Sequence, residues 1–214
     1  MTTKSPARQS GVTLVELMVG LVVSMIVVLA MLAVYKTTAK VSADAGQGAT
    51  TDRQRLSGFF AAQKILLGAG YGIDTPSFGN ELVVLAGATL SDSGNISGTK
   101  ASLPADGNAL IWGTKLDGTY KCQGLYAPRD GGLIRLQETS CSSAANYATI
   151  AWTTITLIED TRSVQISAKT ATGCKSFGLA GEGGLWTTLS TTNSIEGSNA
   201  AVSTSTCLIN FPVS

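Results

Sequence analysis

The chain has 214 residues, a formal net charge of +1 and only 14% charged residues. This length allows one or two domains with a sizeable core, and no clustered basic surface of the kind that binds nucleic acid is present in the sequence. Histidine is absent, so the commonest general base and the usual zinc ligand are missing. Serine and lysine are plentiful, but no motif places them as a catalytic pair, and we expect neither an enzyme nor a cofactor or metal site.

The first feature along the chain is an apolar segment of bilayer length. Leu17 to Tyr35 comprises 19 residues without a formal charge, rich in Val, Leu, Met and Ile. At about 1.5 Å per residue, a helix of this length nearly spans a hydrocarbon core of roughly 30 Å. A secretory signal peptide is the alternative, but its apolar region is usually about 7 to 15 residues long and precedes a small-residue cleavage site. The sequence after Tyr35, KTTA, is a poor site of that kind, so we expect a membrane span.

The charges around this segment predict its orientation. Lys4 and Arg8 precede it, and no acidic residue occurs among the first eleven. Positive charge stays on the cytoplasmic side, so the N-terminus is expected in the cytoplasm and the large C-terminal part on the outer side of the membrane.

A short motif, GVTLVE, connects the basic leader to the apolar segment at Gly11 to Glu16. It resembles the prepilin peptidase site of type IV pilins and type II secretion pseudopilins. The resemblance implies cleavage after Gly11, methylation of the new N-terminal residue Val12, and an assembly role for Glu16 as the fifth mature residue. Val12 departs from the family, in which phenylalanine is commonest at this position.

The physical chemistry of Glu16 agrees with this resemblance. After cleavage, the amine of Val12 and the carboxylate of Glu16 would each be costly to bury alone in a bundle of apolar helices. We expect Glu16 to accept the amine of a neighbouring subunit, which offsets both costs and sets the axial register. The alternative is that Glu16 only reaches the lipid headgroups.

The helix is predicted to continue well beyond the membrane. No proline occurs between Pro6 and Pro76, so a helix from Val12 to Leu67 is allowed, and its 56 positions would span roughly 84 Å. Its last part carries apolar and amide side chains at spacings of three and four, which predicts a face for a globular domain: Leu56, Phe59, Phe60, Gln63, Leu66 and Leu67. Gly46 and Gly48 each lower the helix propensity in the middle of this helix by up to about 1 kcal/mol. They either allow bending during assembly or lie in an exposed stretch under weak constraint.

After the helix the chain is predicted to form strands. LLGAGYG, Leu66 to Gly72, ends the helix and lacks the lysine of a phosphate-binding loop. The predicted strands are Glu81–Ala86, Ala109–Leu116, Thr119–Leu125, Leu133–Gln137, Thr149–Ile158, Val164–Ala168 and one near Leu208–Phe211. Strands after one long helix indicate an α+β fold in which an antiparallel sheet packs on the C-terminal half of the helix. The expected parts are a leader (1–11), a membrane helix (12–35), its amphipathic continuation (36–67) and a β-rich domain (68–214).

Four cysteines, Cys122, Cys141, Cys174 and Cys207, lack the close spacing of a metal or redox site. Two disulfides in an oxidising compartment are expected. Three connectivities are possible, and we favour Cys122–Cys141 with Cys174–Cys207 because these close the shortest loops.

Two further sets of residues have a ligand-binding and an ordinary interpretation. Asp92, Asn95 and Asp106 could supply oxygen atoms to calcium, but no calcium-loop spacing is present, and turn roles are favoured. The three tryptophans, Trp112, Trp152 and Trp186, could form an adhesive surface, but in strand-like runs they are favoured as core.

LLGAGYG and LIEDTRSVQI, Leu157 to Ile166, look like segments of PilW-type minor pilins. The resemblance implies a pilus subunit involved in initiation or biogenesis, held in the inner membrane before it enters an extracellular filament. Its partners would be other pilin subunits, prepilin peptidase, the inner-membrane assembly platform and membrane lipid. A minor pseudopilin of type II secretion and a single-pass, membrane-anchored binding protein are the alternatives.

Overall fold

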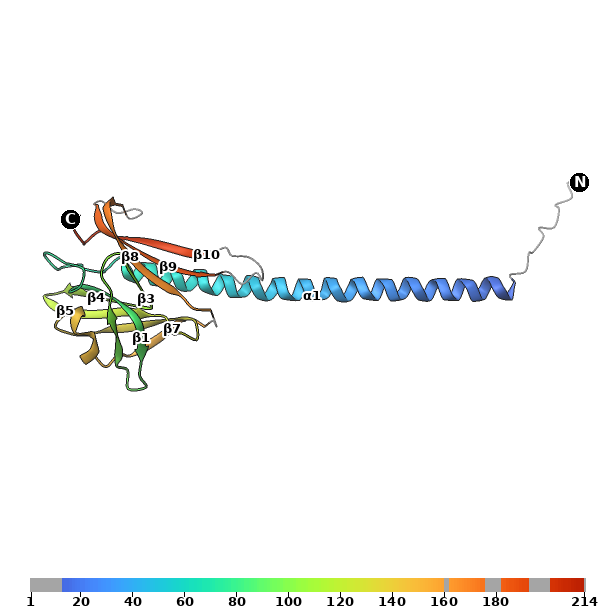
Figure 1. Cartoon of the computed structure of the whole chain (residues 1–214), viewed down its shortest axis with the longest axis horizontal. Coiled ribbons are helices and arrows are strands. Elements are labelled where there is room, and N and C mark those ends of the chain that lie inside the picture. Colours follow the sequence, from blue (N-terminus) through green and yellow to red (C-terminus); the bar gives the residue numbers. More distant parts are fainter. Residues whose placement is uncertain (1–12, 160–161, 176–181, 193–200, 214) are drawn as a thin grey trace, which may run out of the picture. The chain divides into compact units, whose positions relative to one another are not determined.

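The computed structural model describes residues 13–159, 162–175, 182–192 and 201–213. The chain divides into two compact units, residues 1–48 and 49–214. The elements in chain order are α1 (Leu14–Leu66), β1 (Leu82–Leu90), β2 (Ile96–Lys100), β3 (Ala105–Gly107), β4 (Ala109–Leu116), β5 (Thr119–Tyr126), β6 (Leu133–Ser140), a 3-10 helix (Ala144–Thr149), β7 (Thr154–Ile158), β8 (Gln165–Cys174), β9 (Gly183–Thr192) and β10 (Ala201–Leu208). Figure 1 labels α1, β1, β3 to β5 and β7 to β10 along the ribbon.

Helix α1 runs through both units without interruption for 53 residues. Its length follows from the absence of proline and from the strong helix formers along it. The predicted helix is thus present from Leu14, and it ends at Leu66, one residue before the predicted end.

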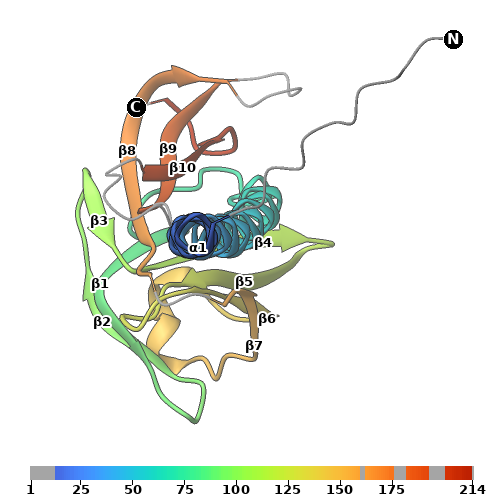
Figure 2. The ribbon, with the colours of Figure 1, turned by 90° about the vertical axis from the view of Figure 1, so that its right-hand side faces the viewer.

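The strands of the second unit form two antiparallel sheets. The six-stranded sheet has the order β2-β1-β4-β5-β6-β7, and the four-stranded sheet has the order β10-β9-β8-β3. Figure 2 shows β8, β9 and β10 on one side of the unit and β4 to β7 on the other. The α+β class is confirmed, with the helix packed on antiparallel strands, although the strands are divided between two sheets.

The main core lies between the last turns of α1 and both sheets. Phe59, Ala62 and Leu66 of the helix form one cluster with Leu110 of β4 and Leu189 of β9. A second cluster covers the other face of the six-stranded sheet with the 3-10 helix and Trp152. Because both faces are covered, β4 reads as a continuous apolar run instead of an alternating one.

The buried stripe of α1 differs from the predicted one in two positions. Phe59 and Leu66 are buried as predicted, but Leu56 and Phe60 are 48% and 67% exposed. The stripe instead continues toward the N-terminus of α1 to Arg55, which is 1% exposed and forms an ion pair with Asp52 at 2.8 Å. A period of 3.6 residues places position 55 above 59 and 62, and turns positions 56 and 60 away from the core.

The glycines of LLGAGYG bring the chain against β4 after the helix. Gly70 donates its backbone N–H to Gly113 at 2.9 Å, and Lys115 donates to the carbonyl of Tyr71 at 2.8 Å. Gly72 has φ +72°, and a Cβ on it would collide with the backbone of Lys115. This segment is therefore more than a helix end, since it docks its backbone along the end of β4.

Several predicted strands differ from the observed ones. The region predicted as one strand from Thr149 begins with the end of the 3-10 helix, and its strand β7 starts at Thr154. The last strand lies at Ala201–Leu208, earlier than predicted. Strands β2, β3 and β9 were not predicted, because their Gly-, Ser- and Thr-rich sequences carry little apolar alternation.

Candidate functional site

Thr13 and Glu16 close the first turn of α1 with reciprocal hydrogen bonds. The Glu16 backbone N–H donates to the Thr13 hydroxyl at 3.4 Å. In return, the Glu16 carboxylate accepts from the backbone N–H of Thr13 at 3.4 Å and from its hydroxyl at 3.5 Å. Since Leu14 is the first helical residue, Thr13 occupies the N-cap and Glu16 the third helical position. The sequence TLVE is therefore a capping box.

The capping box gives Glu16 a role within its own chain. It satisfies N–H groups that the start of a helix leaves without partners, and it places a negative charge at the positive end of the helix dipole. A cap of this kind stabilises a helix by about 1 kcal/mol. Both bonds from Thr13 go to Oε2 of Glu16, and no described residue donates to Oε1. One carboxylate oxygen is thus open to a further donor.

The predicted cleavage and methylation positions, Gly11 and Val12, lie outside the described residues. Thr13 and Glu16 both follow the predicted cleavage point, so removal of the leader after Gly11 would leave the capping box in the mature chain.

The helix that follows presents its apolar side chains outward. Large hydrophobic residues from Leu14 to Tyr35 are 46–73% exposed, and the most apolar 18-residue window of α1 has a mean hydropathy of 2.9. Among the described residues, α1 is the helix long and apolar enough to cross a membrane. A surface of this size is stable only when lipid or other apolar surfaces cover it.

Comparison with known proteins gives one match. The family model for the prokaryotic N-terminal methylation motif matches residues 6–32. No curated protein and no solved structure matches the chain. The motif supports a type IV pilin-like or pseudopilin protein, and it points to a structural subunit and not to an enzyme. Together with the apolar helix, it is consistent with membrane anchoring before assembly.

Both cysteine pairs are disulfide-bonded in the C-terminal unit. Cys122 is joined to Cys141, and Cys174 to Cys207, each pair with a Cα–Cα distance of 5.7 Å. This is the connectivity that the short loops favour. The second bridge joins β8 to β10, the two strands that pair with β9.

Asn95 and Asp106, two of the residues considered for calcium, lie in different parts of the C-terminal unit. The Asn95 amide donates to the carbonyl of Ile150 at 3.3 Å, while Asp106 lies on β3 in the other sheet. No cluster of three acidic, histidine or cysteine side chains suited to a metal occurs in the described parts of the chain.

The three tryptophans differ in burial. Trp112 and Trp152 are buried in the two core clusters, in agreement with the favoured interpretation. Trp186 on β9 is only half-buried, and it lines a groove beside α1.

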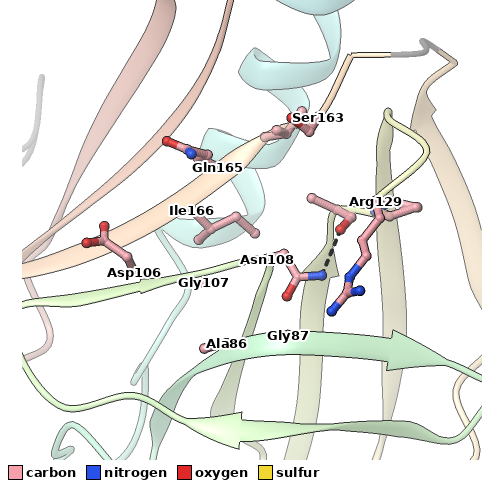
Figure 3. Close-up of a pocket in the computed structure, with 12 residues that line it drawn as sticks. Ala86, Gly87, Asp106, Gly107, Asn108, Arg129, Ser163, Gln165 and Ile166 are labelled. Carbon is pink, nitrogen blue, oxygen red and sulfur yellow. Dashed lines mark hydrogen bonds between the residues drawn. The ribbon is translucent and has the colours of Figure 1, made fainter.

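A polar cavity of about 570 Å³ lies where the chain passes from one sheet to the other. Asn108 occupies this corner, between β3 and β4 (Figure 3). Its side chain accepts from the N–H of Ala88 at 2.7 Å and donates to the carbonyls of Ala88 and Ala127 at 2.9 and 3.0 Å. The Arg129 side chain extends into the same cavity (Figure 3). Both N–H groups and the oxygen of the Asn108 amide thus bond to the backbone, which indicates that this side chain holds the corner.

The roles of Thr13, Arg55 and Asn108 were not predicted from the sequence. The signal for Thr13 was present, because Thr-x-x-Glu before an apolar run is a capping-box pattern. Arg55 has the helical spacing of the buried stripe, but a charged residue is rarely assigned to a core. The side-chain bonds of Asn108 join residues about 20 positions apart, so they leave no local sequence pattern.

Proposed function

We propose that this chain is a structural subunit of a type IV pilus, of the PilW-like minor pilin kind, that takes part in pilus initiation or biogenesis. Prepilin peptidase would remove residues 1–11 and methylate Val12. Residues 12–35 would hold the protein in the inner membrane with the N-terminus in the cytoplasm. Residues 36–67 and 68–214 would then lie on the periplasmic side until the assembly platform transfers the subunit into the filament.

The observation that carries this proposal is the methylation motif at residues 6–32, followed directly by an exposed apolar helix. Within a bundle of such helices, the carboxylate of Glu16 would be desolvated. Thr13 supplies hydrogen bonds to one of its oxygens, and the other is available to the N-terminal amine of a neighbouring subunit. Capping and subunit pairing are therefore compatible. The capping box holds the Glu16 carboxylate in position for the amine of the neighbouring subunit.

A minor pseudopilin of type II secretion is the second candidate, because the same motif supports both classes. Deletion of the gene separates them: a pilus subunit changes the number of surface pili, whereas a pseudopilin changes the export of secreted proteins. A membrane-anchored binding protein predicts an intact leader and no effect in either assay.

The charge and the cap of Glu16 can be tested separately. Glu16→Gln keeps an acceptor for the Thr13 bonds, because glutamine also serves in a capping box, but it removes the negative charge. We expect cleavage of the leader to continue and incorporation into sheared filaments to fall by at least about tenfold, because the neighbouring amine loses its counter-charge. Asp44→Asn, which removes an exposed carboxylate from the same helix, is the matched control and should incorporate normally. Equal incorporation of Glu16→Gln and the control would contradict the assembly role of Glu16.

A further inference from the structure

A groove of about 490 Å³ runs beside the edge strand β10 in the C-terminal unit. One wall is a flank of α1, where Phe60, Lys64 and Leu67 follow the spacing of a single helix face. The other side is formed by Trp186 and Lys175. The groove therefore combines flat aromatic surface with two ammonium groups.

The two aromatic side chains of the groove are more exposed than the two core tryptophans of this unit. Phe60 is 67% exposed, and Trp186 is half-buried, whereas Trp112 and Trp152 are buried in the cores. The exposed phenyl ring of Phe60 and the partly exposed indole of Trp186 thus present apolar surface in one groove, which a ligand with an apolar face would cover.

The outer face of the four-stranded sheet continues from this groove as a surface of hydroxyl groups. The register aligns Ser167 of β8 with Thr188 of β9 and Ser205 of β10, and it aligns Lys169 with Trp186 in the next row. The Thr188 and Ser205 hydroxyls share a hydrogen bond of 2.8 Å. Side chains alternate along a strand, so the buried neighbours Leu185 and Leu189 face the core and leave this hydroxyl face outward.

The charge of the region is positive. Lys64, Lys169 and Lys175 contribute three ammonium groups, and Glu182 lies 3.5 Å from Lys175. Lys64 and Lys169 make no ion pair with any residue in the described ranges, so both are available to an anionic ligand.

We propose that the groove and the adjoining hydroxyl face bind an acidic saccharide. A sugar ring presents an apolar face that suits Trp186 and Phe60. Its hydroxyls are both donors and acceptors, and they match those of Thr188 and Ser205. Its carboxylates suit Lys64 and Lys175. This site is independent of the proposed function, since it lies wholly within the C-terminal unit.

Two other partners fit the site less well. A protein partner would require an apolar contact centre with few polar groups, whereas serine and threonine dominate this face. Single-stranded nucleic acid also uses stacking and cations, but it carries one charge per nucleotide and requires an extended basic track. Three lysines beside one glutamate, in a chain of net charge +1, suit a more sparsely charged polymer.

Binding can be measured with the full chain in detergent micelles by isothermal titration calorimetry. The probes are oligogalacturonate as the acidic saccharide, an isomaltose oligomer as the neutral one, and oligothymidylate. We expect saturable binding of oligogalacturonate, and weaker binding of the neutral oligomer. Trp186→Ala should weaken oligogalacturonate binding by about tenfold, and Phe60→Ala by a smaller factor. Lys64→Gln with Lys175→Gln should remove the preference for the acidic probe.

Tyr71→Ala is the matched control, because this aromatic residue is 55% exposed but does not line the groove. It should bind like the unmodified chain. Phe60 is on the surface of α1, so Phe60→Ala keeps the test valid if Trp186→Ala fails to fold. No saturable saccharide binding, equal affinity of Phe60→Ala and the control, or tighter binding of oligothymidylate would each overturn the proposal.

Discussion

Residues 14–35 of α1 and the strands of the C-terminal unit use the same aliphatic residue types in opposite surroundings. In the helix, large apolar side chains are 46–73% exposed, whereas in β4 the residues from Ala109 to Thr114 are buried. Lipid or other helices must cover the first surface, while the chain itself covers the second. The stability of the folded unit and its attachment to other molecules therefore depend on separate parts of the sequence.

The largest expected effect tests this separation with one residue type in both regions. Leu110 is completely buried and Leu21 is 62% exposed. Leu110→Ala should lower the free energy of unfolding of the C-terminal unit by about 3 kcal/mol, because it removes buried methyl groups and leaves a cavity. Leu21→Ala should change it by less than about 0.5 kcal/mol. Thermal denaturation in micelles, followed by near-ultraviolet circular dichroism, measures the stability of both variants. Similar losses of stability in Leu110→Ala and Leu21→Ala would contradict the separation of folding from attachment.

Asn108→Ala is expected to have the next largest effect. It removes three side-chain hydrogen bonds and leaves backbone groups of Ala88 and Ala127 without these partners. We expect the unit to lose about 2 kcal/mol of stability, because buried polar groups without hydrogen-bond partners carry an uncompensated desolvation cost. Asn146→Ala, which loses one exposed bond to Ser142, is the control and should cost less than about 0.5 kcal/mol. If urea denaturation gives both variants the same loss in free energy of unfolding, Asn108 does not stabilise the corner between the sheets.

Thr13→Val should affect the first region alone. It removes the hydroxyl that accepts from the Glu16 N–H, so the first turn should lose about 1 kcal/mol of stability. Hydrogen exchange in micelles should report faster exchange at the amides of that turn, with no change in the melting of the C-terminal unit. Thr37→Val, whose hydroxyl bonds the Ala33 carbonyl within the helix, should leave those amides unchanged. Protection unaffected by Thr13→Val would show that the capping box is not formed in solution.

The smallest effect concerns pH and the C-terminal unit. Burial, and then the charge of Glu81, raise the pKa of Tyr120 above its usual 10.0, while the backbone of Ala144 partly lowers it. A phenol with a higher pKa in the folded chain keeps its proton longer there. Its contribution to stability is therefore complete below about pH 10 and is lost as the pH rises through the folded pKa.

Tyr120→Phe should flatten the alkaline part of the stability profile. The melting temperature of the unmodified chain should fall more steeply above pH 10 than that of the variant, and the two curves should run parallel below it. Curves that stay parallel throughout would exclude Tyr120 as the responsible group.

The two regions also differed in how far they could be predicted. The apolar segment and the leader were visible because their signals are local: consecutive uncharged residues, and a short motif with a fixed order. The strand β4 was predicted with its observed bounds, because its apolar run from Ala109 to Trp112 is a local signal. Local signals of this kind do not depend on the rest of the fold.

The remaining features depend on long-range contacts. Strand β9 contains mostly glycine, threonine and serine, and its pairing with β8 and β10 decides its structure. At the corner between the two sheets, the Asn108 side chain bonds to backbone groups about 20 residues away. The exposure of Phe60 depends on which helix face packs inward, a choice that several apolar spacings along α1 left open.

The most direct test of the central claim is the N-terminal mass of the protein from cells with and without active prepilin peptidase. Our account predicts a chain that begins with N-methylated Val12 when the peptidase is active, and an intact leader when it is not. An intact leader in both strains would contradict the account, and it would leave this chain a membrane-anchored protein that does not enter a filament.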